Sequence, residues 1–195
     1  MTQDCGLETI GLQTDRRGFI EVDEGLRTAV KDVYAIGDIT GKIQLAHVAS
    51  AQGMVAAANC AGQDKAMRYD RVPSCIYTLP EIAWVGMTEE AAKAAGHEVA
   101  VGSFNVAANG RSMVINEPVG LIRLIVDKAD GKVLGCQMMA ARATDMIAEI
   151  AAVLELGGTV EQLANVIHPH PTVSEIIKEA AHDAEGLCVN AMPRR

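Results

Sequence analysis

The fold is decided by residues 121–138, which read Leu121-Ile122-Arg123-Leu124-Ile125-Val126, then Asp127-Lys128-Ala129-Asp130-Gly131-Lys132, then Val133-Leu134-Gly135-Cys136-Gln137-Met138. Two apolar stretches rich in β-branched residues flank a short polar segment that contains glycine. This pattern is typical of two antiparallel strands joined by a turn. We therefore predict a β-hairpin at the centre of the C-terminal half of the chain.

Further strands and helices are expected on both sides of this hairpin. Apolar, β-prone stretches predict strands at 74–77, 82–85 and 99–106. Capping residues and apolar residues spaced three to four positions apart predict helices at 88–96, around 147–154, just after Thr159 and at 173–184. Because antiparallel strands and helices are grouped here, residues 71–195 are predicted to form an α+β domain, an antiparallel sheet with helices on one side.

The N-terminal part of the chain has a different pattern. Short strands are predicted at 19–23 and 33–36, the second ending at Gly37-Asp38, and a helix rich in small residues at 45–61. A polar stretch then precedes Pro73, which places a domain boundary near residue 70. Residues 1–70 are thus predicted to be a strand–helix unit that belongs to a larger domain.

Composition excludes several classes of function. The chain has 195 residues, 49% of them apolar, and a net charge of −8 without a basic cluster, so neither nucleic acid nor an anionic membrane is an expected partner. No apolar run approaches the length of a membrane span and no leader is visible at the N-terminus, so we expect a cytoplasmic protein. The five cysteines lack Cys-x-x-Cys and Cys-x4-Cys spacing, which favours free thiols over disulfides or a zinc site.

The segment with the most chemistry reads His168-Pro169-His170-Pro171-Thr172-Val173-Ser174-Glu175. Each histidine precedes a proline, which disfavours helical geometry, so His170 is expected just outside the start of a helix. Histidine suits proton transfer near neutral pH, and a carboxylate such as Glu175 could orient its ring. Two alternatives stay open: Thr172 and Glu175 could form only a capping box, and the histidines with His182 could hold a metal.

A second group of candidate residues lies upstream. Asp38 ends a predicted strand, where a carboxylate can accept hydrogen bonds from sugar hydroxyls, although this pattern is also common at ordinary turns. Leu45, Ala46 and His47 begin the predicted helix, whose N-terminal N–H groups could face a phosphate or a flavin ring. His47 could equally be an ordinary polar residue of a first helical turn.

These segments together resemble the pyridine nucleotide–disulfide oxidoreductases, and the resemblance covers essentially the whole chain. Residues 26–38 are similar to the second flavin-binding motif of that family, residues 44–47 to the motif under the flavin ring, and residues 168–175 to its catalytic histidine motif. Residues 73–86 resemble the start of its dimerisation domain, and Asn109-Gly110-Arg111 fits its usual place there.

The resemblance implies a role for each candidate residue. Asp38 would bind the ribityl or phosphate region of FAD, and Gln44, Leu45, Ala46 and His47 would lie against the isoalloxazine. His170, oriented by Glu175, would shuttle a proton for the substrate dithiol and act with the flavin and disulfide of the partner subunit. Residues 1–70 would then be the remnant of an FAD-binding domain, and residues 71–195 the dimerisation domain of a homodimer.

Within the family, the paired His-x-His-Pro-Thr resembles the dihydrolipoamide dehydrogenase branch, which uses FAD and NAD and acts on lipoyl-bearing proteins, more than the glutathione reductase-like branch. The chain departs from the family pattern because it lacks the Gly-x-Gly-x-x-Gly loop and the Cys-x4-Cys redox pair. It is therefore expected to be a C-terminal portion, without bound cofactor and inactive alone. A non-catalytic dimerisation module is the alternative.

Overall fold

The computed structural model describes residue 2 and residues 4–190, so the ends of both predicted domains (residues 1, 3 and 191–195) lie outside the described residues. The chain divides into two compact units, Met1–Tyr69 and Asp70–Arg195. Each unit has its own arrangement of elements, and the second unit carries the histidine motif.

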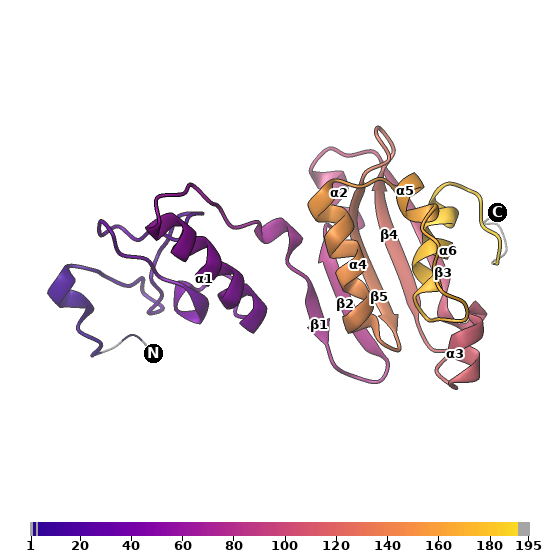
Figure 1. The fold of residues 1–195 in the computed structure, drawn as a ribbon, viewed down its shortest axis with the longest axis horizontal. Helices are drawn as coiled ribbons and strands as arrows, with labels where there is room; N and C mark the ends of the chain where they lie inside the picture. The colour runs from indigo at the N-terminus through magenta and orange to yellow at the C-terminus, as the bar shows by residue number, and fades with distance from the viewer. Residues whose placement is uncertain (1, 3, 191–195) are drawn as a thin grey trace. The chain divides into compact units, whose positions relative to one another are not determined.

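The second unit is built on a five-stranded antiparallel sheet with the strand order β1-β2-β5-β4-β3 (Figure 1). Its strands are β1 (Ser74–Ile76), β2 (Glu81–Gly86), β3 (Val99–Asn105), β4 (Leu121–Asp127) and β5 (Val133–Ala140). The predicted hairpin is confirmed as β4 and β5, with Leu124 opposite Cys136 and a register shift at Ile125/Val126. This hairpin also connects the two halves of the sheet, because β2 pairs with β5 and β3 pairs with β4.

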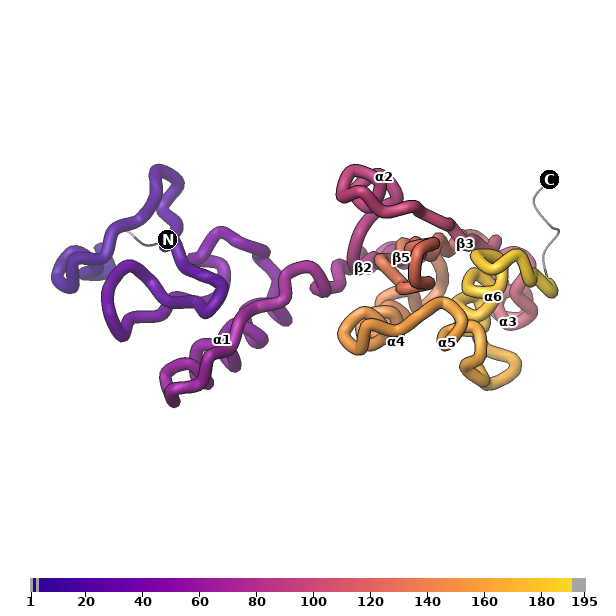
Figure 2. Tube along the Cα trace, turned by 90° about the horizontal axis from the view of Figure 1, so that it is seen from above, coloured from indigo at the N-terminus to yellow at the C-terminus, as the bar shows by residue number. Residues whose placement is uncertain are grey.

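Several helices pack around this sheet. They are α2 (Glu89–Ala94), α3 (Gly110–Val114), α4 (Ala143–Leu156), α5 (Val160–Ala164) and α6 (Glu175–Ala184), with a 3₁₀ helix at Val106–Ala108. Figure 2 shows α4, α5 and α6 on one side of the strands and the short α2 on the other. The α+β prediction is confirmed, but α2 departs from the expected arrangement because it lies on the face opposite α4, α5 and α6.

The core lies between the sheet and the long helices. Alternate side chains of β4, Ile122 and Leu124, are fully buried against the helix residues Ile147, Ile150 and Ile176. Gly102 of β3 lies so close to α6 that a Cβ there would collide with the Ala180 carbonyl oxygen. This close approach packs the C-terminal half of α6 directly on β3.

The first unit contains the predicted α-helix, α1 (Ala46–Cys60), and 3₁₀ helices at Leu7–Ile10 and Gly37–Thr40; another 3₁₀ helix spans Tyr69–Arg71. The predicted strands at 19–23 and 33–36 are wrong: neither range forms a strand, and Tyr34 makes only an isolated antiparallel bridge with Arg27. A β-prone stretch needs neighbouring strands to complete its hydrogen bonds, and two strands alone are marginal. A small core of Leu12, Ile20 and Ala35 supports these segments instead.

Two further sequence expectations can be compared with the structure. All five cysteines are free, as predicted, and Cys136 is buried, which raises the pKa of its thiol far above the usual range. Across the described residues, no helix is both long enough and apolar enough to cross a membrane.

Candidate active site

The histidine motif forms the loop between α5 and α6. The helix α6 begins at Glu175, two residues later than the predicted start, and its N-cap Ser174 makes no side-chain capping hydrogen bond. Within the loop, the Thr172 hydroxyl donates to the Pro169 carbonyl (2.8 Å) and lies 2.9 Å from the Ser174 hydroxyl. These bonds stabilise a compact turn that presents His170.

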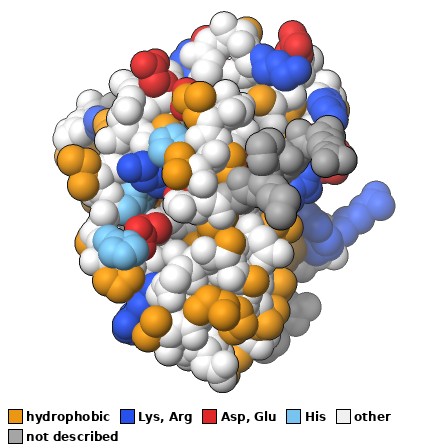
Figure 3. Space-filling model, turned by 90° about the vertical axis from the view of Figure 1, so that its right-hand side faces the viewer, with side chains coloured by type: hydrophobic (Ala, Val, Ile, Leu, Met, Phe, Trp, Pro, Cys, Tyr) orange, Lys and Arg blue, Asp and Glu red, His pale blue; other side chains and the backbone are white. Residues whose placement is uncertain are grey.

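The structure brings the two predicted catalytic residues together. Nδ1 of His170 lies 2.9 Å from Oε1 of Glu175, while Oε2 of the same carboxylate accepts the Thr172 backbone N–H at 2.9 Å. The His170 side chain is 78% exposed, and Figure 3 shows histidine side chains on this end of the molecule with an acidic side chain against one of them. Glu175 therefore both closes the turn and orients the ring.

The capping-box alternative is met only in part. In a capping box the Thr172 hydroxyl would accept the N–H three residues later. Here that hydroxyl donates to Pro169 instead, and only the carboxylate half of the box, Glu175 to the Thr172 N–H, is present. The structural reading of Glu175 thus coexists with its contact to His170.

The charge of Glu175 follows from its surroundings. Burial on its own raises the pKa of this carboxyl, but the Thr172 N–H bond, the His170 hydrogen bond and electrostatic attraction to the rings of His170 and His168 outweigh it and lower the pKa. An ionised carboxylate can only accept, so the proton of the contact lies on Nδ1 of His170. Nε2 then points away from Glu175, and among the described residues it has no hydrogen-bond partner. Such a nitrogen can take a proton from a donor that approaches from outside.

A second histidine–carboxylate pair lies directly beside the first, and sequence reasoning missed it. Nε2 of His168 lies 3.1 Å from Oε1 of Glu149 on α4, and Nδ1 lies 3.3 Å from the Val166 carbonyl oxygen. The His168 side chain is only 4% exposed. The hydrogen bond to Glu149 raises the pKa of His168 despite the opposing effect of burial. Only the packing of the loop on α4 brings these two residues together.

Asn109 is a third residue of the site that sequence reasoning did not assign to it. Its buried side chain donates from Nδ2 to the Thr172 carbonyl (3.0 Å), and its Oδ1 caps α3 by accepting the Ser112 N–H (2.8 Å). The Asn109-Gly110-Arg111 signal was visible in the sequence, but its contact with the histidine loop was not. The loop is therefore held from α4 at His168 and from α3 at Thr172.

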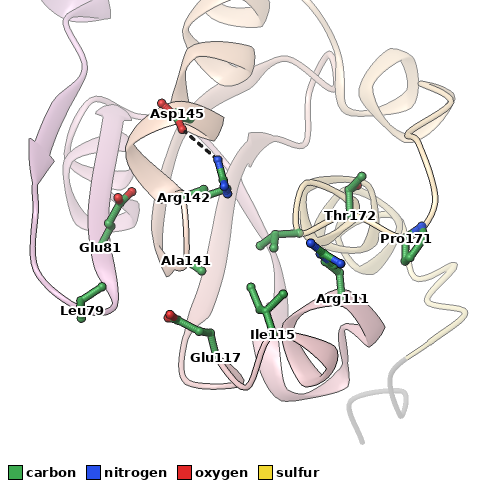
Figure 4. A pocket seen from close by; sticks show the side chains of 11 residues that line it. Leu79, Glu81, Arg111, Ile115, Glu117, Ala141, Arg142, Asp145, Pro171 and Thr172 are labelled. Atoms are coloured by element: carbon green, nitrogen blue, oxygen red, sulfur yellow. Dashed lines mark ion pairs between the residues drawn. The ribbon is translucent and has the colours of Figure 1, made fainter.

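A cavity of about 850 Å³ opens beside this loop (Figure 4). Pro171 and Thr172 form one wall, with Arg111 directed into the space, and Arg142 and Asp145 form an ion pair on the opposite side. The cavity thus gives access to the segment that follows His170.

The residues predicted to face a flavin all lie in the first unit, whereas the histidine loop belongs to the second. Asp38 and Gln44 are exposed and line a cavity of about 500 Å³, whereas Leu45, Ala46 and His47 form the start of α1. Leu45 is the N-cap of α1, in an extended conformation, and makes no side-chain capping hydrogen bond. An exposed carboxylate and a helix N-terminus whose N-cap residue offers no side-chain acceptor fit the hydroxyl and electron-rich groups of part of a flavin nucleotide.

One buried residue of this region was not predicted. Gln52 of α1 is fully buried, accepts the Gly37 N–H at Oε1 (2.6 Å) and donates from Nε2 to the Tyr69 hydroxyl (2.9 Å). It fixes the turn in which Asp38 lies against α1. The sequence did not indicate this contact, because Gln52 lies within a helix rich in alanine and no local pattern marks it.

The metal alternative finds no support in the described residues. His168 and His170 each contact a different glutamate, and no group of three or more His, Cys, Asp or Glu side chains is arranged to bind a metal ion within the part of the chain that the structure describes.

Comparison with known families matches both units. The pyridine nucleotide-disulphide oxidoreductase dimerisation domain matches residues 72–181, and the pyridine nucleotide-disulphide oxidoreductase family matches residues 2–53. The first match alone covers more than half of the chain.

Individual proteins are similar to nearly the whole chain. Dihydrolipoyl dehydrogenase 2 of Haloarcula marismortui is 43% identical over 97% of this chain and 40% of its own length, and dihydrolipoyl dehydrogenase of Geobacillus stearothermophilus is 42% identical over 99% and 41%. The crystal structure of LpdA from Mycobacterium tuberculosis superposes with a TM-score of 0.88 at 31% identity, covering 93% of this chain and 40% of that one. The chain therefore spans about 40% of the length of these relatives. These matches, together with the histidine loop and the antiparallel sheet described above, show that the chain belongs to the pyridine nucleotide–disulphide oxidoreductase family.

Proposed function

We propose that this chain supplies the acid–base pair, the subunit interface and part of the flavin-facing surface of a dihydrolipoyl dehydrogenase. Such an enzyme converts a dihydrolipoyl dithiol and NAD+ to the lipoyl disulfide, NADH and a proton. The observation that carries the proposal is the His170–Glu175 pair, in which one ring nitrogen is held by a carboxylate and the other is exposed. The dihydrolipoyl dehydrogenases that cover nearly the whole chain support the choice of substrate.

The proposed role of His170 follows from its geometry. Nε2 accepts the proton of a substrate thiol, which leaves a thiolate, the form of sulfur that attacks a disulfide. The resulting imidazolium is stabilised by the Glu175 carboxylate at Nδ1. Bound FAD would accept the electron pair and pass it to NAD+, and Asp38 with the start of α1 would hold part of that cofactor. The redox disulfide of such an enzyme would come from outside this chain, which has no Cys-x4-Cys.

The proposed interface is the sheet face opposite α4 and α6. Ile82, Trp84, Leu121 and Met139 line an almost wholly apolar hollow of about 330 Å³ on that face. The short α2 lies on the same side and is tied to it by the ion pair between Glu89 and Arg123. Exposed apolar patches of this kind mark association surfaces, and a second copy of the chain is the occupant that the matched dimerisation domain favours.

A chimeric enzyme tests the catalytic part. This chain replaces the aligned stretch of the Geobacillus stearothermophilus dihydrolipoyl dehydrogenase, and NADH formation from dihydrolipoamide is followed. We expect flavin binding and turnover, and a loss of about 10²–10⁴-fold in turnover on His170→Gln, the usual contribution of acid–base catalysis. The control is His97→Gln, which alters the His97–Asp127 pair at the other end of the sheet. A chimera without flavin, or an unchanged turnover in His170→Gln, overturns the proposal.

The interface is tested by sedimentation of the 195-residue chain. Trp84→Glu places a charge in the apolar hollow and should convert dimers to monomers. Leu156→Glu, at the exposed end of α4 and away from that hollow, is the matched control and should leave the dimer intact. A wild-type chain that is monomeric at all concentrations, or dimers that persist in Trp84→Glu, would count against this interface.

A further inference from the structure

The role proposed above for His170 leaves its neighbour His168 unexplained. Both ring nitrogens of His168 face oxygen acceptors, Nε2 the Glu149 carboxylate and Nδ1 the Val166 carbonyl. A neutral imidazole carries a proton on only one nitrogen, so it can donate to only one of them. The imidazolium satisfies both contacts, and the His168 side chain itself is only 4% exposed.

We propose that His168 is a positioning residue: a buried imidazolium that ties the histidine loop to Glu149 of α4 and thereby fixes the ring of His170. The inference deepens the proposed function and rests on it, because it assigns a role to a residue that would act on the reaction only through His170. His168 has almost no exposed surface, so it is not itself offered as a catalytic residue.

Two independent contacts connect His168 to the reactive pair. The first is covalent and steric: only Pro169 separates His168 from His170, and the Pro169 carbonyl accepts the Thr172 hydroxyl that closes the turn. The second is electrostatic, because the charge of His168 is among those that keep the Glu175 carboxylate ionised. Lys178 of α6 also acts on His168, and its charge lowers the pKa of that ring less than the hydrogen bond to Glu149 raises it. Loss of the His168 charge would therefore have two effects. It would loosen the loop, and it would make the Glu175 carboxylate a weaker hydrogen-bond acceptor for His170.

The first test reads the two rings directly. Long-range ¹H–¹⁵N spectra of the 195-residue chain distinguish imidazolium from neutral imidazole and report the tautomer. At pH 7 we expect protons on both nitrogens of His168 and a proton held on Nδ1 of His170. In Glu149→Gln we expect His168 to become neutral and His170 to lose its single tautomer. A neutral His168 in the wild-type chain, or an unchanged His170 in Glu149→Gln, overturns the proposal.

The second test uses turnover in the chimera. His168→Ala should lower kcat about 10- to 100-fold, the size of effect produced by small misplacements of a reacting group, with little change in KM. Because His168 acts through His170, adding His168→Ala to His170→Gln should cause no further loss. His168→Lys, which keeps a positive charge beside Glu149, should recover part of kcat.

The outcomes separate this inference from the proposed function. If His170→Gln leaves turnover unchanged, the proposed function fails. If His170→Gln lowers turnover and His168→Ala lowers it by the same further factor in that background, His168 serves only the stability of the fold and the positioning role fails. Glu149→Gln provides the same comparison should His168→Ala not fold.

Discussion

The two histidines of the loop have the same kind of partner and opposite surroundings. His168 and His170 each precede a proline and each contact a glutamate at about 3 Å. His168 is 4% exposed and has acceptors at both nitrogens, whereas His170 is 78% exposed and has a partner at one nitrogen only. A histidine with both nitrogens committed can hold structure but cannot exchange protons readily, while one with a free nitrogen can.

The difference arises from where the two carboxylates lie. Glu175 is five residues after His170 at the start of α6, at the edge of the protein, so its partner stays exposed. Glu149 lies 19 residues before His168 in the middle of α4, which packs on the sheet, so its partner is drawn inward. The comparison teaches that the chemistry of a histidine–carboxylate pair depends on the element that supplies the acid.

After the loss expected for His170→Gln, the next largest effect should come from removing the negative charge of Glu175 at the exposed pair. Glu175→Gln in the chimera should lower turnover about 10- to 100-fold, part of the contribution of acid–base catalysis, because the amide no longer stabilises the imidazolium. Steady-state kinetics of dihydrolipoamide oxidation measure it. Glu185→Gln, at the other end of α6, is the control and should leave turnover unchanged. Equal losses in both variants would show that Glu175 has no special role.

Disruption of the buried pair, His168 and Glu149, should lower the free energy of unfolding. Glu149→Ala leaves a buried His168 N–H without its acceptor, and we expect the free energy of unfolding to fall by about 2 kcal/mol. Alanine is the best helix former, so the change should not weaken α4 itself. Urea denaturation of the 195-residue chain measures it, with Glu155→Ala as the control. Glu155 lies in the same helix and pairs with Arg71 near the surface, so its removal should cost less than about 1 kcal/mol.

The second anchor of the loop should have a smaller effect. Asn109→Ala removes the cap of α3 and the bond to the Thr172 carbonyl, and should lower the free energy of unfolding by about 1 kcal/mol. It should also release the tautomer of His170 in NMR spectra. Asn105→Ala removes a similar but exposed cap that does not contact the loop, and it should leave the His170 spectrum unchanged. Identical spectra for both variants would argue against an anchor at Asn109.

The smallest effects should appear in the pH dependence of the free energy of unfolding. His168 should affect its alkaline side and Glu175 its acid side. The raised pKa of His168 means that its contribution is complete below about pH 6.5 and is lost as pH rises through the folded value. The lowered pKa of Glu175 means that its contribution is present above about pH 4.5 and is lost as pH falls through the folded value. Urea denaturation at several pH values should show the alkaline loss disappear in Glu149→Ala and the acid loss shrink in Glu175→Ala. The reverse assignment would contradict the comparison.

The sequence by itself determined the second unit well. The hairpin 121–138, the helix caps at Thr88 and Thr159, and the contact of His170 with Glu175 were all predictable. Each depends on residues close together in the chain, where periodicity, capping and turn chemistry act directly. The predicted strands of the first unit failed for the complementary reason: strands need partners, and local β-preference cannot supply them.

Only the tertiary structure decided which of the two histidines is buried. The motif presents His168 and His170 as near equivalents, and nothing local distinguishes them. The packing of α4 and α6 on the sheet places Glu149 under His168, and Asn109 of a separate element under Thr172. Burial and long-range hydrogen bonds depend on this packing, because they join groups that are distant in sequence.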